Sequence, residues 1–400
     1  MRRSRKILLL VFIVLLLIQV PFIYRRFELR RLSQTIDRLN AERKPVEPNP
    51  KYSEYVGVMH VHSFLGGHSS GTFSDIISAA QANKLSFVVM TEHVEKDFDT
   101  AESTLKGLHG GVLFVNGNEV SATDGERVLV VPGTNKVVTK EGTTYSELIT
   151  AATANGALTI AAYPNDLKSL EAKFDALEIY NVYTNARSIN PITTFFDVLW
   201  SHRTYPDLLF ANFYQRPDGA VQKWDQLLSK RRITATAGND AHANIGVSLV
   251  DSSGKTLIGL QLDPYSTSFH LVRMHVLVPR DKELSATTLL EALKQGHCFI
   301  GFDIFGDTTG FRFEAENSGE SRVQGDEILF RPGTKLKIEV PLKARINLHK
   351  DGQIVTTEDG VFRRDFELKD KGIYRVEAYL PELGSVGTKP WIISNPIYVR

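Results

Sequence analysis

Two histidines, His60 and His62, close an apolar, β-branched segment that begins at Val56. Side chains two residues apart in a regular strand project to the same face, so this spacing predicts that both imidazoles share a face. Neutral imidazole is a frequent ligand of zinc, manganese and iron, and a bound metal would explain two histidines in an apolar strand. The alternative is a pair of half-buried histidines bonded to the backbone, because the motif is short.

Other apolar segments of the chain also end in side chains that commonly bind metals. Histidine supplies a neutral nitrogen ligand, whereas aspartate and glutamate supply anionic oxygens that can bridge two cations. Two cations about 3.5–4 Å apart bind an oxyanion and deprotonate a water, so such a site needs no separate nucleophile. These side chains at successive segment ends therefore predict a multi-metal hydrolase. They are His93, Glu119, Asp240 and His242.

Short apolar segments alternate with amphipathic segments through the first three quarters of the chain. Strands that alternate with helices predict βα units around a parallel sheet. Polar residues at every strand end favour a barrel over a doubly wound open sheet, in which ligands gather at one switch point. The expected strands are residues 56–61, 85–90, 112–115, 158–162, 176–180, 208–213 and 233–237. The expected helices are residues 73–84, 145–155, 193–202 and 221–231.

Length and composition set broad limits on the class of protein. The chain has 400 residues, which suggests two or three structural units, and 42% of them are hydrophobic, as in ordinary globular proteins. The formal net charge of +1 gives no electrostatic reason to expect a nucleic-acid partner. The single cysteine, Cys298, excludes an intrachain disulfide and a cysteine-rich zinc site.

The N-terminus has the pattern of a membrane anchor. Residues 7–24 carry no charge and are long enough to cross a bilayer as one helix. No small-x-small cleavage site follows them, which favours an uncleaved single-pass anchor over a signal peptide. Basic residues flank both ends of the span, and the very short N-terminal tail favours a body outside the cytoplasm.

A charged helical segment, residues 27–43, follows the span. Leu29, Leu32, Ile36 and Leu39 recur at heptad-like spacing and could pair two chains into a homodimer. A solvated helical spacer is the alternative interpretation. Three prolines within residues 44–51 then end the helix and form a stiff linker.

The pattern of hydrophobic and polar residues changes after residue 306. A helix at residues 285–295 and a strand at residues 299–304 precede this point. Short alternating segments, separated by the turn signals Asp351-Gly352, Asp359-Gly360 and Lys371-Gly372, then predict an immunoglobulin-like β-sandwich. These segments are residues 311–315, 335–340, 346–350, 374–379 and 395–399. The predicted units are therefore an anchor (1–24), a spacer and linker (25–50), a barrel (51–305) and a sandwich (306–400).

The order of the histidine and acidic motifs resembles that of the PHP superfamily, named for polymerase and histidinol phosphatase domains. The resemblance covers residues 55–302, and the β segment that follows is similar to the CehA/McbA-like branch. It implies a distorted (β/α)7 TIM-like barrel with a cluster of zinc, manganese or iron, and phosphoesterase or related hydrolase chemistry. The motifs are His60-Val61-His62, His68, Thr91-Glu92-His93, Glu119 and Gly238-Asn239-Asp240-Ala241-His242.

The resemblance also implies two sets of metal ligands. The first set is His60, His62, Glu119 and Asp240. The second set is His68, His93 and His242, with Glu92 where aspartate is common. A third metal would need a His-Pro dipeptide and a further histidine, but the chain has Tyr163-Pro164 and only Asn181 or Asn212. Two divalent transition metals per chain are therefore expected.

The predicted function is that of a membrane-anchored, metal-dependent phosphoesterase that uses metal-bound hydroxide on a small-molecule or phosphorylated substrate. Glu119, Asp240 and Tyr163 are its candidate catalytic residues, since a neutral phenol is a poor ligand but a good hydrogen-bond donor. One alternative is a weakly active or inactive metal-binding module for ligand binding or assembly, supported by Tyr163 and by Ser70 in an altered Ser-Asp-Gly motif. Another is an ester or amide hydrolase.

The remaining histidines and some basic residues have weaker functional signals. Lys96, Lys168 and Arg187 follow strand ends and could hold a phosphate, although solvated loop charges are the simpler interpretation. The histidines without partner spacing are predicted to be structural or to lie at the surface. They are His109, His202, His270, His275, His297 and His349.

Overall fold

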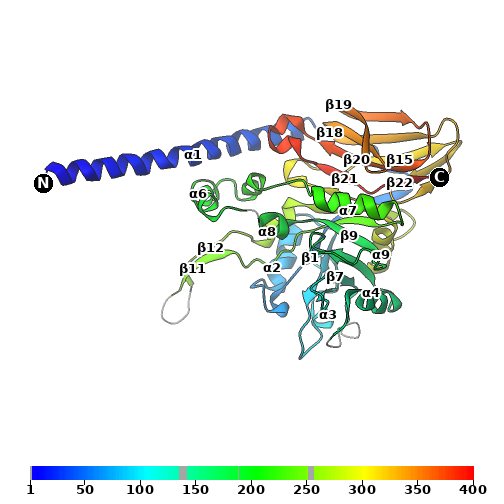
Figure 1. Cartoon of the computed structure of the whole chain (residues 1–400), viewed down its shortest axis with the longest axis horizontal. Helices are drawn as coiled ribbons and strands as arrows, with labels where there is room; N and C mark the ends of the chain where they lie inside the picture. Colours follow the sequence, from blue (N-terminus) through cyan, green and yellow to red (C-terminus); the bar gives the residue numbers. More distant parts are fainter. Residues whose placement is uncertain (1, 135–141, 188, 251–255) are drawn as a thin grey trace.

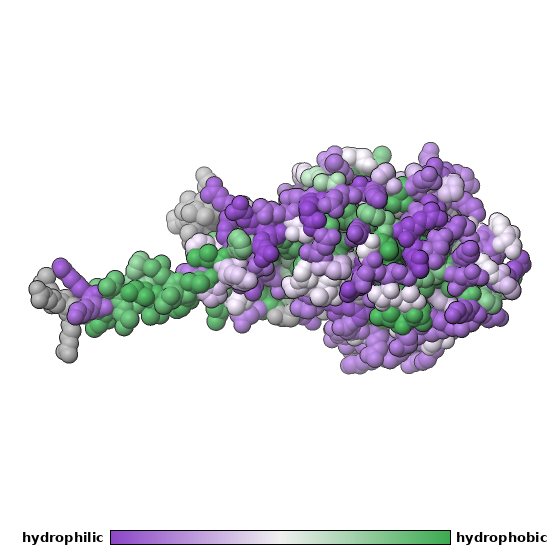
Figure 2. Space-filling view, turned by 90° about the horizontal axis from the view of Figure 1, so that it is seen from above, coloured by the Kyte–Doolittle hydropathy of each residue, from purple (hydrophilic) through white to green (hydrophobic). Residues whose placement is uncertain are grey.

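A computed structural model describes residues 2–134, 142–187, 189–250 and 256–400. Its most prominent feature is a long helix, α1 (Arg2–Ala41), that projects from a mixed α/β body, while the C-terminus lies at the opposite end of the molecule (Figure 1). The N-terminal half of α1 stands clear of the body, as Figure 2 shows by its continuous apolar surface.

Two sheets carry the strands of the predicted barrel. In the first sheet, β1, β2 and β5 are parallel, and β13 and β14 extend it in the antiparallel sense beyond β1. The second sheet has the order β10-β9-β8-β7-β6-β3. The strands of the first are β1 (Tyr52–Val61), β2 (Phe87–Met90), β4 (Gly107–His109), β5 (Val112–Val115), β13 (Arg273–Pro279) and β14 (Cys298–Gly301). Those of the second are β3 (Glu92–His93), β6 (Asn118–Ser121), β7 (Arg127–Val131), β8 (Leu158–Ala162), β9 (Ala176–Asn181) and β10 (Thr234–Gly238).

The predicted closed barrel of parallel strands is not confirmed. Strand β7, which the sequence pattern did not reveal, is antiparallel to both β6 and β8. The two sheets do not join into one closed ring among the described residues, although β1 and the end of β10 meet at an isolated bridge between Val61 and Ala241. The architecture shown is mixed α/β with the ends of β1 and β10 side by side.

Most predicted helices are present, but one predicted strand is not. Residues 208–213 were expected to form a strand and instead lie in a 3-10 helix, η3 (Asp207–Asn212). A short apolar run fits either structure by periodicity alone, and Pro206 already adopts helical angles at its start. The helices of the body are α2 (Phe73–Ala82), α3 (Thr100–Ser103), α4 (Tyr145–Ala154), α5 (Val182–Ala186), α6 (Pro191–Ser201), α7 (Asp218–Leu228), α8 (Tyr265–Leu271) and α9 (Ala286–Gln295). A hairpin of β11 (Gly246–Val250) and β12 (Thr256–Gln261) stands apart from both sheets.

The C-terminal strands extend the first sheet, because β21 pairs with β14. Two segments predicted separately form one long strand, β18, and its partner β19 was not predicted. The supposed turn at Asp359-Gly360 lies inside β19, where the pairing with β18 shifts and Gly360 has φ +66°, so this pair marks a bulge. These strands are β15 (Arg312–Asn317), β16 (Glu320–Val323), β17 (Glu327–Ile328), β18 (Lys335–Lys350), β19 (Gln353–Glu367), β20 (Gly372–Tyr379), β21 (Ile392–Ser394) and β22 (Ile397–Val399). The immunoglobulin-like sandwich and its boundary at residue 306 stay predictions.

The C-terminal part of α1 packs on the body. Leu29, Ile36 and Leu39 are only 3%, 8% and 2% exposed. Arg38 reaches Glu382 in η5 (Pro381–Leu383), and the backbone N–H of Lys44 donates to Pro341. The leucine and isoleucine seam is therefore buried within the chain itself and is not free to pair with a second chain. A homodimer stays a prediction.

The N-terminal part of α1 is long and apolar enough to cross a membrane, with only 6% of its most apolar window buried. A signal sequence passes the same test of length and composition. The apolar side chains from Ile7 to Ile18 are all more than 40% exposed, so the described body does not cover them.

Candidate metal centre

His60 and His62 converge, but not by regular strand alternation. His60 has φ +64°, and the pairing of β1 with β2 shifts register between Met59 and Val61. The ring centroids of His60 and His62 lie 5.1 Å apart. The same-face prediction is thus met through a bulge at His60 that turns its side chain toward that of His62.

Two further site residues also have left-handed backbone angles. Tyr163 follows β8 with φ +49°, and Asp240 follows β10 with φ +50°. Residues other than glycine seldom adopt these angles, which cost on the order of 1–3 kcal/mol and cluster at functional sites. Backbone strain therefore marks three of the eight side chains that the sequence singles out.

A first group of possible metal ligands consists of four buried side chains whose donor atoms all lie within 4.8 Å of one another. Glu119 Oε2 lies 3.3 Å from His60 Nε2 and 3.5 Å from His62 Nε2. Asp240 Oδ1 lies 3.6 Å from each of the same two nitrogens. The ligands of a tetrahedral ion with bonds of ~2.0–2.2 Å stand roughly 3.3–3.6 Å apart, so this group has the spacing of a cation site. Its members are His60, His62, Glu119 and Asp240.

Unpartnered polar atoms in this group also favour a cation. Both ring nitrogens of His62 and Oδ1 of Asp240 are buried and have no hydrogen-bond partner among the described residues. A buried polar atom without a partner is costly, typically ~1–3 kcal/mol, and is rare unless an ion, water or ligand satisfies it. The residues present therefore fit a divalent metal.

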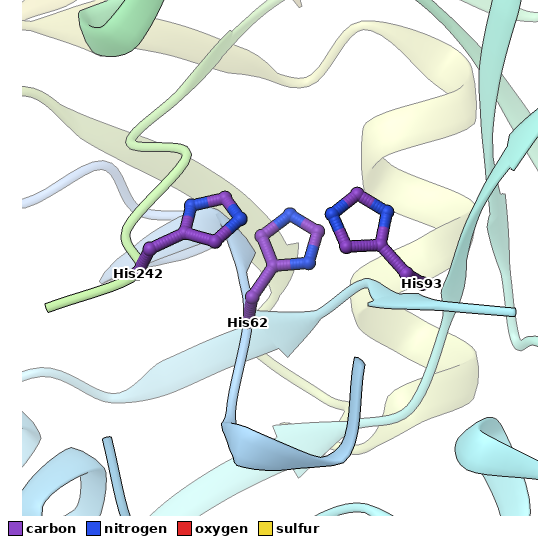
Figure 3. A group of neighbouring side chains, drawn as sticks. All are labelled: His62, His93 and His242. Atoms are coloured by element: carbon purple, nitrogen blue, oxygen red, sulfur yellow. The ribbon is translucent and has the colours of Figure 1, made fainter. Parts of the chain in front are cut away.

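A second group joins His62, His93 and His242, again with ligand atoms within 4.8 Å of one another. Figure 3 shows the ring of His62 between those of His242 and His93. The ring centroid of His62 is 4.2 Å from that of His242 and 4.5 Å from that of His93. His62 thus belongs to both groups, although its neutral ring, with one free lone pair, can bind only one metal.

His68 lies outside both groups. His68 is exposed, and the centroid of its ring lies 5.1 Å from that of His93 in an edge-on arrangement. The sequence places His68 with His93 and His242 as a ligand, whereas the described geometry puts His62 in that position. His68 remains a proposed ligand that would need to move toward the cluster.

Glu178 is a site residue that sequence reasoning missed. Its Oε1 lies 2.7 Å from His60 Nδ1, and its Oε2 accepts a hydrogen bond of 3.0 Å from Asn181. A Cβ on Gly238 would come within 1.8 Å of the Glu178 carboxylate, so glycine leaves it room. A carboxylate bonded to one ring nitrogen fixes the other toward a metal. The available signal was a glutamate inside the apolar strand β9.

Arg127 was also missed, because strand β7 was not predicted. Its guanidinium donates a hydrogen bond of 2.9 Å to Glu119 Oε1 and lies 5.0 Å over the ring of Tyr163. Burial alone would raise the pKa of Glu119, but the hydrogen bond from His60 and the charges of His60, His93 and Arg127 lower it to about 2. Glu119 is therefore an anion at neutral pH, as a metal ligand requires.

Two histidines of the second group, His62 and His93, are held neutral. Burial, together with the neighbouring imidazoles, lowers the pKa of His62 well below its ordinary value. Burial also lowers the pKa of His93, to about 4, although Glu119 acts in the opposite direction. Neutral imidazole is the form that binds metals, so both rings are ready ligands near pH 7.

Tyr163 bonds to a proposed ligand and remains protonated. Its hydroxyl donates to Asp240 Oδ2 over 2.7 Å, and Asn181 approaches the same oxygen at 3.3 Å. Burial and the nearby carboxylates of Asp240, Glu119 and Glu178 raise the pKa of Tyr163. The donors on Oδ2 leave Oδ1 of Asp240 to face the histidines. Asn212, the other asparagine considered from sequence, instead bonds to Asp197.

Glu92 and the serines near His68 hold the loops of the site. Glu92 accepts hydrogen bonds from the backbone and hydroxyl of Ser63 and from Thr104, so it is not a free ligand. Ser69 and Ser70 donate to the backbone carbonyls of His242 and Ala243. These bonds connect the segment after β1 to the segment after β10.

Four of the six side chains in the two ligand groups, His93, Glu119, Asp240 and His242, line a cavity of about 1040 Å³. Its wall also includes the basic side chains of Arg127, Arg187 and Lys96, and the ring of Tyr163. Lys168 does not line it; its backbone N–H donates to Glu126. The arrangement brings oxygen and nitrogen ligands, basic groups and a phenol together in a space large enough for an organic anion.

No family model and no curated protein matches the chain. One similar solved structure is a two-domain protein containing a predicted PHP-like metal-dependent phosphoesterase from Bacteroides vulgatus ATCC 8482. It is 14% identical with a TM-score of 0.39, and the match covers 88% of this chain and 98% of that one. Another is PsfC from Pseudomonas syringae PB-5123, at 16% identity, a TM-score of 0.40, and coverage of 60% and 90%. Both TM-scores are too low to assign a fold or a function to this chain.

Proposed function

We propose that the chain is a membrane-anchored, metal-dependent hydrolase of PHP type that acts on phosphoesters. The observation that carries the proposal is the pair of neighbouring ligand groups, four of whose side chains line a cavity together with three basic side chains. The order of the sequence motifs supports the PHP superfamily and the distorted barrel. The CehA/McbA-like branch rests on sequence resemblance alone.

In this proposal, one metal would be held by His60, His62, Glu119 and Asp240, and a second by His93 and His242, joined by His68 after a movement of its side chain. When bound, divalent cations of this kind lower the pKa of water and neutralise charge that develops on phosphoryl oxygens. Zinc, manganese and iron all fit the ligand types.

The chain's own residues position the ligands and attract the substrate. Glu178 fixes the ring of His60, while Tyr163 and Asn181 orient the carboxylate of Asp240. Arg187 and Lys96 also line the cavity, and neither has a carboxylate partner among the described residues, whereas Arg127 bonds to Glu119. Both supply positive charge for a phosphate. These contacts favour an anionic ester over a neutral one.

Two other functions use the same ligands. An ester or amide hydrolase would also use divalent cations, although the basic wall of the cavity favours a phosphate. A weakly active or inactive module for ligand binding or assembly would bind metal without turnover.

The membrane anchor is α1, with the apolar residues 7–24 in the bilayer and the body outside the cytoplasm. The exposed apolar surface of α1 supports the anchor (Figure 2). Protease treatment of intact cells tests the orientation, because a cytoplasmic body would be protected.

Turnover by the full-length protein in detergent, with added manganese or zinc, separates the three functions. We expect metal-dependent release of nitrophenol from p-nitrophenyl phosphate or bis-p-nitrophenyl phosphate, and its loss in Glu119→Gln. The matched control is Glu283→Gln, an exposed glutamate outside the site. Turnover of p-nitrophenyl acetate alone would instead indicate a carboxylic ester hydrolase, and metal binding without any turnover would indicate a binding module.

A further inference from the structure

The cavity has an apolar part that a phosphate group alone would not need. Its volume of about 1040 Å³ is at the upper end of the ~300–1,000 Å³ typical of sites for drug-sized ligands. Apolar side chains from α5, α6, η3 and the residue after η3 share the wall with the ligand cluster. They are Val182, Ala186, Val198, Leu209, Phe210 and Phe213. A ligand that fills this space has a hydrocarbon part as well as an anionic group.

Helix α6 separates this cavity from an exposed apolar surface. Thr194 and Val198, one turn apart, line the cavity. Ile192, Phe195 and Leu199 recur at spacings of three and four on another face, and they are 69%, 63% and 66% exposed. Three large apolar side chains in a row on one exposed helix face are costly in water and mark a contact surface.

The position of α6 beside α1 indicates what covers this surface. Phe196 stacks on Phe22 of α1 with ring centroids 4.5 Å apart, and the indole of Trp200 donates to Gln19 over 3.0 Å. Asp197 receives two hydrogen bonds, of 2.7 and 2.6 Å, from Arg25. Figure 1 shows α6 next to α1 on the side of the body from which α1 projects. Helix α6 is therefore attached to the last turns of the apolar span.

These contacts place α6 at the depth where the span of α1 ends. The uncharged segment stops at Tyr24, and Arg25 and Arg26 follow it at the level expected for lipid headgroups. The guanidinium of Arg26 bonds to the carbonyl of Trp200 and to Thr204, which ties the end of α6 to the same level. The apolar face of α6 is then at the boundary between headgroups and acyl chains, as in interfacial helices.

We infer that the exposed face of α6 lies in the bilayer surface and that the substrate is a membrane amphiphile. Its anionic phosphoester group lies at the ligand cluster, and its hydrocarbon chain occupies the apolar cavity wall formed by α5, α6 and η3. This inference rests on the proposed phosphoesterase function and names the class of its substrate.

The docking of α6 is tested by a fluorescent reporter in the full-length protein. Trp200→Phe removes the tryptophan on α6, and Phe195→Trp in that background places a new one on the exposed face. Trp224 and Trp391, at 0% and 1% exposure, form a shielded background. In liposomes with brominated acyl chains, we expect the emission of the new tryptophan to fall by at least half compared with plain liposomes. Emission equal to that in plain liposomes would overturn the docking of α6.

The substrate class is tested with two phosphodiesters that share a p-nitrophenyl leaving group but carry a methyl or a dodecyl chain. With the metal-loaded protein in liposomes, we expect kcat/KM to be at least tenfold higher for the dodecyl ester. Val198→Trp, which fills the apolar wall, should lower the ratio of dodecyl to methyl turnover at least tenfold.

Equal turnover of both esters, or an equal loss of both in Val198→Trp, would overturn the amphiphile assignment while leaving the phosphoesterase function intact. Turnover of neither ester would contradict the proposed function and, with it, the substrate class. The quenching experiment would still decide whether α6 docks, because it does not depend on activity.

Discussion

The hydroxyl of Tyr163 donates a hydrogen bond to Asp240 Oδ2 over 2.7 Å, and both residues have left-handed backbone angles. The bond joins the end of β8 to the end of β10 beside the proposed metal site. In the proposed site, Tyr163 therefore orients a carboxylate ligand rather than binding the metal itself.

Tyr163→Phe tests this role, because it removes only the hydroxyl. At saturating metal we expect turnover of a phosphodiester to fall roughly tenfold to a thousandfold, the range for loss of one well-placed donor at a reaction centre. Tyr183→Phe, which also lines the cavity and is 46% exposed, is the control and should retain activity. Turnover of Tyr163→Phe at the level of the unmodified protein would show that the hydroxyl has no part in the reaction.

Glu178→Gln tests whether His60 is oriented by its outer carboxylate. The amide keeps the shape but removes the charge that faces His60 Nδ1, and such changes lower metal affinity about 10- to 100-fold. Titration of the apo protein with zinc, followed by competition with a chelator, measures the shift. The exposed Glu283→Gln is again the matched control, and an unchanged affinity in Glu178→Gln would exclude an orienting role.

His275 predicts a decrease in stability at alkaline pH. The buried ring lies 2.6 Å from Glu54 and 3.4 Å from Asp303, whose own carboxylate also pairs with Arg273. Burial alone would lower the pKa of His275, but the charges of Asp303 and Glu54 and their hydrogen bonds raise it to about 9. Because the folded pKa is above the unfolded value of ~6.5, the protonated ring stabilises the fold fully below about pH 6.5. This stabilisation is lost as the pH rises through 9.

Thermal unfolding in detergent between pH 6 and pH 10 measures this effect. We expect the free energy of unfolding to decrease by up to about 3 kcal/mol across the range. His275→Gln should remove most of this dependence of the unfolding free energy on pH. His109→Gln, a change near the surface, should leave the dependence as it is in the unmodified chain. An identical slope in His275→Gln and the unmodified chain would assign the pH dependence to other groups.

Two truncations separate the anchor from the part of α1 that packs on the body. Removal of residues 1–24 should abolish integral membrane insertion and leave a folded body. Removal of residues 1–50 also deletes Leu29, Ile36 and Leu39, and each buried side chain contributes about 1.5–3 kcal/mol. We therefore expect the longer truncation to melt at a clearly lower temperature or to aggregate. Equal melting temperatures would mean that the buried seam contributes little to stability.

Sequence patterns predicted what is local in this fold. Thr144 caps the start of helix α4 and forms a capping box with Glu147, and the amphipathic pattern located the helix within a few residues. The ligand types at the end of β1, after β5 and after β10 were also predicted from sequence, because metal-binding side chains there follow apolar segments. The structure brings them together as two groups around His62.

The parts that sequence did not predict depend on contacts between distant segments. The bulge at His60 appears only when β1 pairs with β2, and the antiparallel strand β7 carries Arg127 to Glu119 across the sheet. Glu178 resembled an ordinary strand residue until its partner His60, 118 positions away, was known. The sequence also did not reveal what covers the leucine and isoleucine seam of α1, so pairing with a second chain was considered. The elements that contact α1 include η5 and β18, which lie more than 290 residues further along the sequence.

The central claim is that the groups around His62 hold divalent metal, and metal content tests it most directly. Elemental analysis of the full-length protein after mild purification should find about two transition-metal ions per chain. His62→Ala and His60→Ala, which each remove a ligand of the first group, should both lower the content, while His109→Ala should match the unmodified protein. The absence of metal after purification, together with a failure to rebind zinc or manganese, would contradict the account.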